Sequence, residues 1–221
     1  MSKNYYIIPV FISHQGCPHQ CVFCNQDRIA GKYEEVFASD VRKIIDEYLG
    51  TINSKGATIE VSFFGGTFTA IDVNKQKELL EVAREYKEKG LIHKIRLSTR
   101  PDAILPYILG YLKEYKVDII ELGVQSLDDE VLRKAGRGHS VNDVVVASKL
   151  IKEAGFTLGH QIMPGLPGDN FEIDIETTKK SIEMKPDICR IYPSLVIKDT
   201  PMEDMYKRGD YVPYSLDEAV Y

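Results

Sequence analysis

The sequence has no long hydrophobic run and no excess of positive charge. The apolar stretch near its start, residues 5–12, is much shorter than the roughly 18 residues that a transmembrane helix needs, and no cleavage-site pattern follows it. We therefore expect a cytoplasmic protein without a membrane partner. The net charge of -5 and the pI of about 5.6 argue against a dedicated nucleic-acid-binding protein, which usually carries a basic surface.

Linkers, internal repeats and low-complexity tracts are also absent, whereas apolar residues make up 43% of the chain, enough to fill a core. We expect a single domain over residues 1–221. Near the end, Ser215 stands three residues before Glu218, a pattern typical of a helix start. Because a single helical turn is not stable alone, we expect the native protein to continue beyond Tyr221.

Cysteine is scarce, but three of the four cysteines lie within eight residues, as Cys17, Cys21 and Cys24. In a reducing compartment such a group binds metal more often than it forms disulfides. Three thiolates on one loop can each bind one iron of a [4Fe-4S] cluster, which leaves the fourth iron open to an outside ligand. The alternative is a zinc site with His14 or His19 as the fourth ligand.

Six apolar runs alternate with helical patterns along the chain, which predicts an α/β fold. The expected strands span residues 5–12, 58–64, 92–98, 117–124, 156–163 and 187–196. Strict alternation implies a parallel sheet with helices outside it. Six strands are too few for a closed eight-stranded barrel, so a three-quarter barrel and an open doubly wound sheet both fit. Two of the expected helices begin at Ser126 and Ser140, each with an aspartate three residues on.

Polar or glycine-rich segments follow every expected strand, where the carboxyl ends of parallel strands meet at one rim. These segments are residues 17–24, 65–68, 98–102, 123–126, 163–168 and 191–193. We expect them to build one site.

Several side chains on this rim are candidates for holding a small ligand. The backbone of Gly65, Gly66 and Thr67 could approach a zwitterion closely, although a plain tight turn explains the glycines equally well. Arg100, with Ser98 beside it, offers a bidentate fork for a carboxylate; the alternative is a solvated arginine.

The later strands add further candidates. Gln125 and Ser126 could bond ribose hydroxyls, and Ser126 could equally serve as a helix cap. Arg137 lies in a glycine-flanked loop and could reach an anion, with surface exposure as the alternative. His160 and Gln161 are consecutive strand residues, so one of them faces the interior and could touch a substrate.

The fourth cysteine, Cys189, lies in the last expected strand, away from the other three. We interpret it as a buried, apolar-like side chain and not as a metal ligand.

Cys17, Cys21 and Cys24, with Phe23 between the last two, resemble the signature of the radical S-adenosylmethionine (SAM) superfamily, and the resemblance covers nearly the whole chain. Residues 121–132 with Arg137-Gly138-His139 resemble both the Elongator catalytic-subunit family and the oxygen-independent coproporphyrinogen III oxidases. Three further segments resemble the Elongator family more closely, namely residues 65–68, 163–168 and 190–197.

The resemblance implies a partial, about six-stranded parallel βα barrel and a [4Fe-4S] cluster on the three cysteines. It implies that an electron, from a donor such as a flavodoxin or ferredoxin, cleaves SAM into methionine and a 5′-deoxyadenosyl radical. It also assigns the SAM contacts. By resemblance, Gly65, Gly66 and Thr67 lie at the amino group of SAM, Ser98 and Arg100 near its carboxylate, Gln125 and Arg137 near ribose and carboxylate, and Met163, Ile191 and Tyr192 beside the adenine.

The Elongator family modifies the wobble uridine of tRNA with acetyl-CoA, so a tRNA wobble uridine is the candidate substrate. This sequence differs from that family in a shorter cysteine loop and in a brief segment at residues 87–93, and we expect no acetyltransferase domain within residues 1–221. We therefore carry over only the cluster and SAM sites. Two alternatives stay open: a non-catalytic iron–sulfur or zinc domain that binds a partner, and a coproporphyrinogen-oxidase-like radical enzyme.

Overall fold

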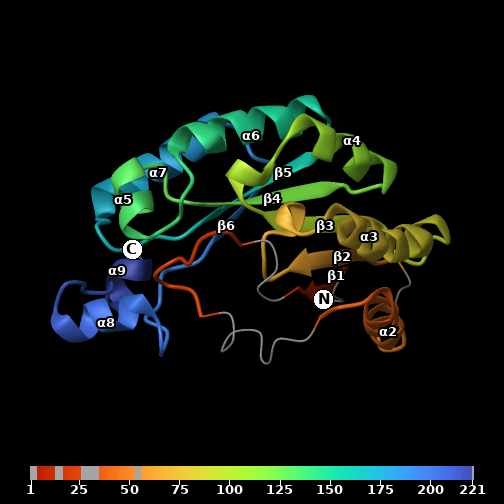
Figure 1. Ribbon diagram of the computed structural model, residues 1–221, viewed down its shortest axis with the longest axis horizontal. Coiled ribbons are helices and arrows are strands. Elements are labelled where there is room, and N and C mark those ends of the chain that lie inside the picture. Colours follow the sequence, from red (N-terminus) through yellow and green to blue (C-terminus); the bar gives the residue numbers. More distant parts are fainter. Residues whose placement is uncertain (1–3, 13–16, 26–34, 53–55, 221) are drawn as a thin grey trace.

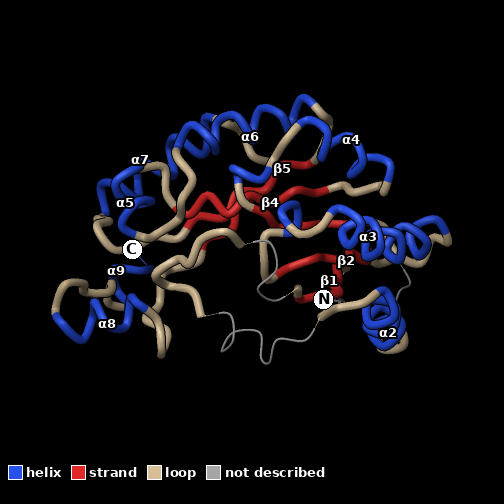
Figure 2. The backbone as a smooth tube through the Cα atoms, in the orientation of Figure 1, coloured by secondary structure: helices blue, strands red, loops and turns tan. Residues whose placement is uncertain are grey.

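A computed structural model describes residues 4–12, 17–25, 35–52 and 56–220. Six parallel strands form one curved sheet in sequence order, from β1 to β6 (Figures 1 and 2). Sequential order excludes the doubly wound sheet and confirms the partial βα barrel. The strands are β1 (Tyr5–Phe11), β2 (Thr58–Phe64), β3 (Lys94–Thr99), β4 (Ile119–Gln125), β5 (Thr157–Ile162) and β6 (Ile188–Ile191).

Helices α2 to α7 lie in an arc on the convex side of the sheet, while α8 and α9 lie beyond β6, near the segment that follows β1 (Figure 1). The helices are α2 (Ala38–Leu49), α3 (Val73–Glu88), α4 (Pro106–Glu114), α5 (Asp129–Lys134), α6 (Val141–Glu153), α7 (Phe171–Glu183), α8 (Pro201–Arg208) and α9 (Leu216–Val220). Short 3-10 turns, η1 (Phe68–Ala70) and η2 (Pro101–Ala103), follow β2 and β3. None of the helices described is long and apolar enough to cross a membrane.

The two faces of the sheet differ in chemistry because side chains alternate along each strand. On β3, Ile95 and Leu97 are fully buried within the apolar core, beneath the helices. Arg96, between them, is buried too, but it pairs with carboxylates of the neighbouring strands. The concave face therefore carries polar and charged groups, and the convex face carries the hydrophobic core.

The expected helix starts are confirmed at Ser140 and wrong at Ser126. Ser140 forms a capping box with Asp143, as expected. Helix α5, however, is capped by Asp128, whose carboxylate accepts hydrogen bonds from the N–H groups of residues 130 and 131 at 2.9 and 3.0 Å. A charged carboxylate is a stronger acceptor than the Ser126 hydroxyl, which instead accepts the N–H of Asp128 at 3.3 Å.

The last expected strand is shorter than residues 187–196, because β6 ends at Ile191 and Pro193, two residues on, has no N–H to donate. Helix α8 was not expected. Its signal is Thr200 before Pro201 and Glu203: the Thr200 hydroxyl accepts the Glu203 N–H at 3.1 Å, and proline occupies the first helical position. The single domain over residues 1–221 stays a prediction.

Candidate functional site

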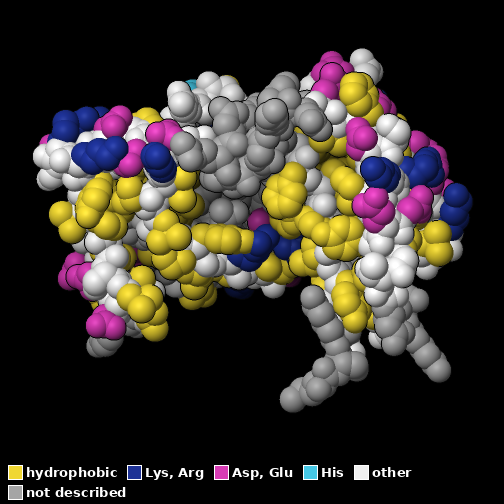
Figure 3. Space-filling model, turned by 90° about the horizontal axis from the view of Figure 1, so that it is seen from below, with side chains coloured by type: hydrophobic (Ala, Val, Ile, Leu, Met, Phe, Trp, Pro, Cys, Tyr) yellow, Lys and Arg dark blue, Asp and Glu magenta, His cyan; other side chains and the backbone are white. Residues whose placement is uncertain are grey.

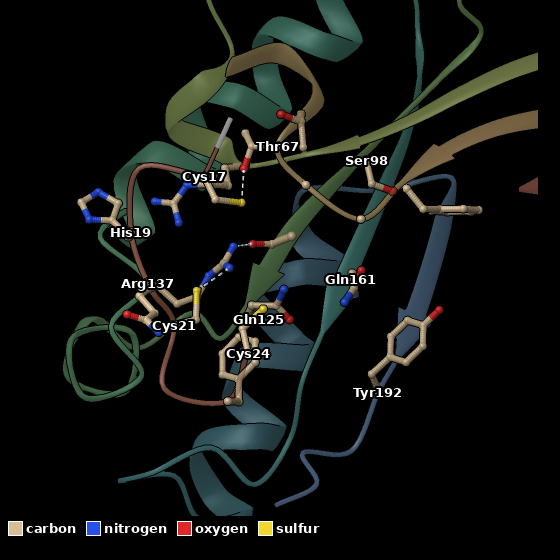
Figure 4. Close-up of a pocket in the computed structure, with 18 of the residues that line it drawn as sticks. Cys17, His19, Cys21, Cys24, Thr67, Ser98, Gln125, Arg137, Gln161 and Tyr192 are labelled. Carbon is tan, nitrogen blue, oxygen red and sulfur yellow. Dashed lines mark hydrogen bonds between the residues drawn. The ribbon is translucent and has the colours of Figure 1, made fainter. Parts of the chain in front are cut away.

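A cavity of about 850 Å³ opens on the concave side of the sheet, at the carboxyl ends of the strands. Its volume falls within the range of about 300–1,000 Å³ typical of small-molecule sites. Most of the candidate residues line it together, and Figure 4 shows how several of them face one another. They are Cys17, Cys21, Cys24, Gly65, Gly66, Thr67, Ser98, Arg100, Gln125, Arg137 and Tyr192.

Two expected adenine contacts lie outside this lining. Met163 is half-buried and packs against a small cluster formed by Val131, Ala135 and Leu166. Ile191 is 62% exposed. The structure brings neither of them to the cavity wall, so their contact with an adenine stays a prediction.

The cysteine loop is held by backbone bonds from two sides. Val22 donates its N–H to the Ala135 carbonyl at 3.0 Å and accepts the N–H of Met202, in the first turn of α8, at 2.9 Å. The Asn25 amide donates to the carbonyls of Lys198 and Asp199 at 3.2 and 3.0 Å. The segment that leads into α8 therefore supports the loop that carries the three thiols.

Arg137 is buried against this loop, so its expected alternative, surface exposure, is wrong. Its Nη1 donates to Cys21 Sγ at 3.3 Å and its Nη2 to the Gly123 carbonyl at 2.7 Å (Figure 4). The turn needs glycine at Gly138, whose φ is +73° and whose added Cβ would come within 2.3 Å of the His19 ring. Because the cysteine loop packs closely on this turn, the guanidinium of Arg137 lies beside Cys21.

The three thiols suit a multi-iron cluster better than a single zinc ion. They open on one cavity, with Cys17 Sγ 3.2 Å from Thr67 Oγ1 and Cys21 Sγ facing Arg137. No three His, Cys, Asp or Glu side chains in the described part of the chain lie close enough to hold one metal ion. Zinc draws its ligands to about 2.0–2.3 Å around one point, whereas a cubane takes one cysteine per iron and tolerates a wider spacing.

The histidines of the zinc alternative are placed differently. His14 lies outside the described residues. The His19 ring lies against Gly138, and His19 also lines the cavity.

Opposite the loop, the ends of β2 and β4 have unusual backbone. Gly65 has a φ of +107°, and a Cβ there would lie 3.0 Å from the Ile12 carbonyl oxygen, so only glycine fits this close approach. Gln125 has a φ of 68° at a register shift between β4 and β5, and its Oε1 is buried without a partner among the described residues. Strain and an orphaned acceptor at one residue on a cavity wall are typical of a ligand contact.

Arg100 is buried, not solvated, and it already has a carboxylate partner. Its Nε and Nη2 bond both oxygens of Asp102, at 2.9 and 3.0 Å. Ser98 is half-buried, and its hydroxyl donates weakly to Glu121 at 3.4 Å. Of the two arginines proposed as anion contacts, Arg100 therefore already binds a carboxylate, that of Asp102. Arg137 faces the cavity and has no carboxylate partner among the described residues.

Among the cavity residues that the sequence analysis did not propose as site groups are Glu121 and Arg190. The sequence signal that could have found them is a charged residue within an otherwise apolar strand, such as Glu121 in β4. The structure also settles which residue of the β5 pair faces inward. Gln161 lines the cavity, whereas His160 is fully buried on the helix side, where it bonds the hydroxyls of Ser148 and Ser181, both at 2.9 Å.

Burial sets the protonation of several groups around the site. It lowers the pKa of His160 to about 4. It also lowers the pKa of His139 to about 4, assisted by the nearby charge of Arg137, and the Nε2 of that ring bonds the Val124 carbonyl. Both rings are therefore neutral near pH 7. Burial, and then the neighbouring Asp174, raise the pKa of Asp169 to about 8.

The expectation that Cys189 is buried is wrong, because its side chain is exposed. It lies on β6, the last strand of an open sheet, which has a neighbouring strand on one side only. Cys189 is not among the residues that line the cavity, and that it is not a metal ligand stays a prediction.

Comparisons with known proteins agree with this arrangement. The Radical SAM superfamily model matches residues 11–180, and the Radical_SAM C-terminal domain model matches residues 186–221. The chain therefore belongs to the radical SAM superfamily and is an enzyme of that class. The second match begins just before β6 and includes the segment that supports the cysteine loop.

The chain is similar to a tRNA uridine(34) acetyltransferase of Methanocaldococcus infernus, at 30% identity over 97% of this chain and 47% of that protein. It is similar to human Elongator complex protein 3, at 27% identity over 97% of this chain and 47% of the relative. Among solved structures, archaeal Methanocaldococcus infernus Elp3 with an N-terminal deletion superposes with a TM-score of 0.77 and 26% identity, over 100% of this chain and 53% of that one. The chain thus spans about half the length of these relatives.

Proposed function

We propose that this chain binds a [4Fe-4S] cluster through Cys17, Cys21 and Cys24, cleaves SAM reductively, and directs the resulting radical to a tRNA wobble uridine. The observation that carries the proposal is that three thiols, a buried arginine and an orphaned amide oxygen share one cavity. Membership of the radical SAM superfamily supports the same chemistry. When bound and reduced, the cluster supplies the electron that cleaves SAM into methionine and a 5′-deoxyadenosyl radical.

The residues of the chain have separate roles in this proposal. Arg137 positions Cys21 and offers its remaining donor capacity to the carboxylate of SAM, because a guanidinium binds carboxylates well. The orphaned Gln125 Oε1 accepts a hydrogen bond from a ribose hydroxyl. Gly65 and Gly66 allow the backbone to approach the amino group of the ligand.

Other cavity residues complete this SAM site. Thr67 and Ser98 line the cavity as neutral hydroxyl groups, the first beside Cys17 Sγ and the second beside Glu121. The bound partner of Arg100, Asp102, fixes that guanidinium at the edge of the site. Tyr192 is proposed on the adenine side, together with Ile191 at the end of β6 and Met163 directly after β5.

The direct test of this proposal is the formation of 5′-deoxyadenosine. Protein reconstituted with iron and sulfide without oxygen, reduced by flavodoxin or ferredoxin and given SAM should release the nucleoside. Cys21→Ala should abolish both cluster assembly and product. The matched control is Cys189→Ala, because that thiol lies outside the cavity lining and its loss should change neither. Uptake of zinc without sulfide would contradict the proposal and leave the non-catalytic domain as the better reading.

The tRNA part of the proposal is supported by the names of the relatives, of which two are a tRNA uridine(34) acetyltransferase and an Elongator protein. The test is whether an RNA hairpin with uridine at the wobble position is consumed or modified when SAM is cleaved, compared with a tetrapyrrole substrate. Turnover of the tetrapyrrole and not of the RNA would favour the coproporphyrinogen-oxidase-like alternative. Acetyl-CoA, added in a further arm, tests whether the product requires it.

A further inference from the structure

The cavity has a second wall, built from β4, β5 and β6, on which three residues have no contact with SAM in the proposed function. Glu121, Gln161 and Arg190 face the cavity from these three strands. In Figure 4, Gln161 and Tyr192 lie across the cavity from Cys17 and Cys21. A molecule bound against this wall would lie within reach of a ligand held between the wall and the cysteine loop.

The charges on this wall cancel. Arg96 bridges two strands, with its Nε 2.7 Å from Glu60 Oε1 and its Nη1 2.9 Å from Glu121 Oε2. Arg190 Nη1 lies 3.2 Å from the other oxygen of Glu121. Two guanidinium groups thus balance two carboxylates across neighbouring strands, and among the described residues this wall has no surplus cation for an anionic substrate. Since an added charge there would lack a partner at low dielectric, the wall favours an uncharged group.

Flat groups line the cavity beside this wall. The guanidinium of Arg190 lies 5.5 Å from the centre of the Phe64 ring and 4.9 Å from that of Tyr192. The Phe11 ring continues the surface, with its centroid 6.0 Å from that of Phe64. Figure 3 shows hydrophobic side chains gathered across this open side of the sheet. Aromatic and guanidinium planes of this kind stack planar rings, nucleobases among them.

Gln161 is the uncommitted polar group on this surface. It lies between Gly123 and Arg190 in the register of the sheet, and its side chain points into the cavity (Figure 4). None of the described residues bonds its amide, and it is half-buried. A side-chain amide has two donors and an acceptor, the set that reads the edge of a base.

We infer that Gln161 is a specificity-determining residue, whose amide reads the hydrogen-bonding edge of a planar, uncharged ring stacked near Arg190. This inference rests on the proposed function and assigns the recognition of its nucleobase to one residue of the cavity wall. A tetrapyrrole with several propionate groups does not suit the neutral wall. The base would belong to a single-stranded loop, because a paired base hides the edge that Gln161 reads.

The test uses two RNA hairpins that differ only in uridine or cytidine at the wobble position, bound to the reconstituted protein with SAM. Gln161→Glu keeps the shape of the side chain but leaves acceptors only, which suits the amino group of cytosine. We expect the affinity for the cytidine hairpin, relative to the uridine hairpin, to rise by about tenfold. Asn142→Asp, an exposed amide on α6, makes the same chemical change far from the cavity and should leave the ratio as it is.

The outcomes separate this inference from the proposed function. An unchanged ratio in Gln161→Glu, with wild-type protein that cleaves SAM and binds the hairpins, overturns the role of Gln161 alone. Wild-type protein that cleaves SAM but binds neither hairpin overturns both this inference and the tRNA part of the proposal. A ratio that shifts in a protein unable to form 5′-deoxyadenosine supports base reading and contradicts the radical chemistry.

Discussion

The two faces of the same sheet contrast sharply. On the convex face, Ile95 and Leu97 of β3 pack into a dry apolar core beneath the helices. On the concave face of that strand, Arg96 joins a chain of ion pairs that ends at the cavity. Alternation along one strand thus separates the residues that stabilise the fold from those that shape the site. Removing one charge from the concave face should lower the free energy of unfolding strongly, because each buried charge there depends on its partner.

The largest effect is expected from Arg96→Met. It leaves Glu60 and Glu121, both fully buried, without their shared partner, so the free energy of unfolding should fall by about 3–5 kcal/mol. Urea denaturation measures this change. Lys94→Met, on the same strand but more exposed, is the control and should lose less than about 1 kcal/mol. A loss in Arg96→Met no greater than in the control would mean that the ion chain is not a structural element.

Leu97→Ala tests the other face of the same strand. Removal of this fully buried side chain leaves a cavity, which should lower the free energy of unfolding by about 2–5 kcal/mol. Because Leu97 faces the helices, cleavage of SAM per folded molecule should stay near that of wild type. Loss of that cleavage in protein that circular dichroism shows to be folded would contradict the division between the faces.

A smaller effect concerns His160 on the convex side. Its folded-state pKa of about 4 lies below the ordinary value near 6.5, so the unfolded chain binds more protons between these pH values. Stability should therefore fall as the pH is lowered from 6.5 to 4, by up to about 1.4 kcal/mol per pH unit for each such histidine. His160→Gln should flatten the slope measured by urea unfolding across this range. An unchanged slope would show that the ring is protonated in the fold.

A pH effect of the opposite sign is expected at Asp169. Its folded-state pKa of about 8 lies above the ordinary value near 4, so the fold binds more protons and its stability declines as the pH rises from 4 to 8. Asp169→Asn mimics the protonated form and should stabilise the protein at pH 8, with little effect at pH 4. Asp217→Asn, on the exposed face of α9, is the matched control. Equal shifts in both variants would rule out the buried carboxyl pair.

Much of the convex face follows from the sequence, because apolar periodicity and strand alternation are local signals. The expected strands at residues 5–12 and 58–64 match β1 and β2 closely for this reason. The rim segments also predicted which residues meet, since parallel strands share one edge. Glu121 and Arg190 escaped notice because their pairing depends on a register that only the folded sheet defines. Helix α8 has a capping signal but little apolar periodicity, and Met202 is its one fully buried residue.

The central claim is that the concave face holds a cluster with an open iron that SAM occupies. The most direct measurement is the electron paramagnetic resonance spectrum of the reduced, reconstituted protein with and without SAM. The account predicts the signal of a reduced [4Fe-4S] cluster that changes when SAM is added, and no such signal in Cys21→Ala. A signal that does not change when SAM is added, or a protein that retains zinc and no sulfide, would contradict the assignment of a cluster with an open iron.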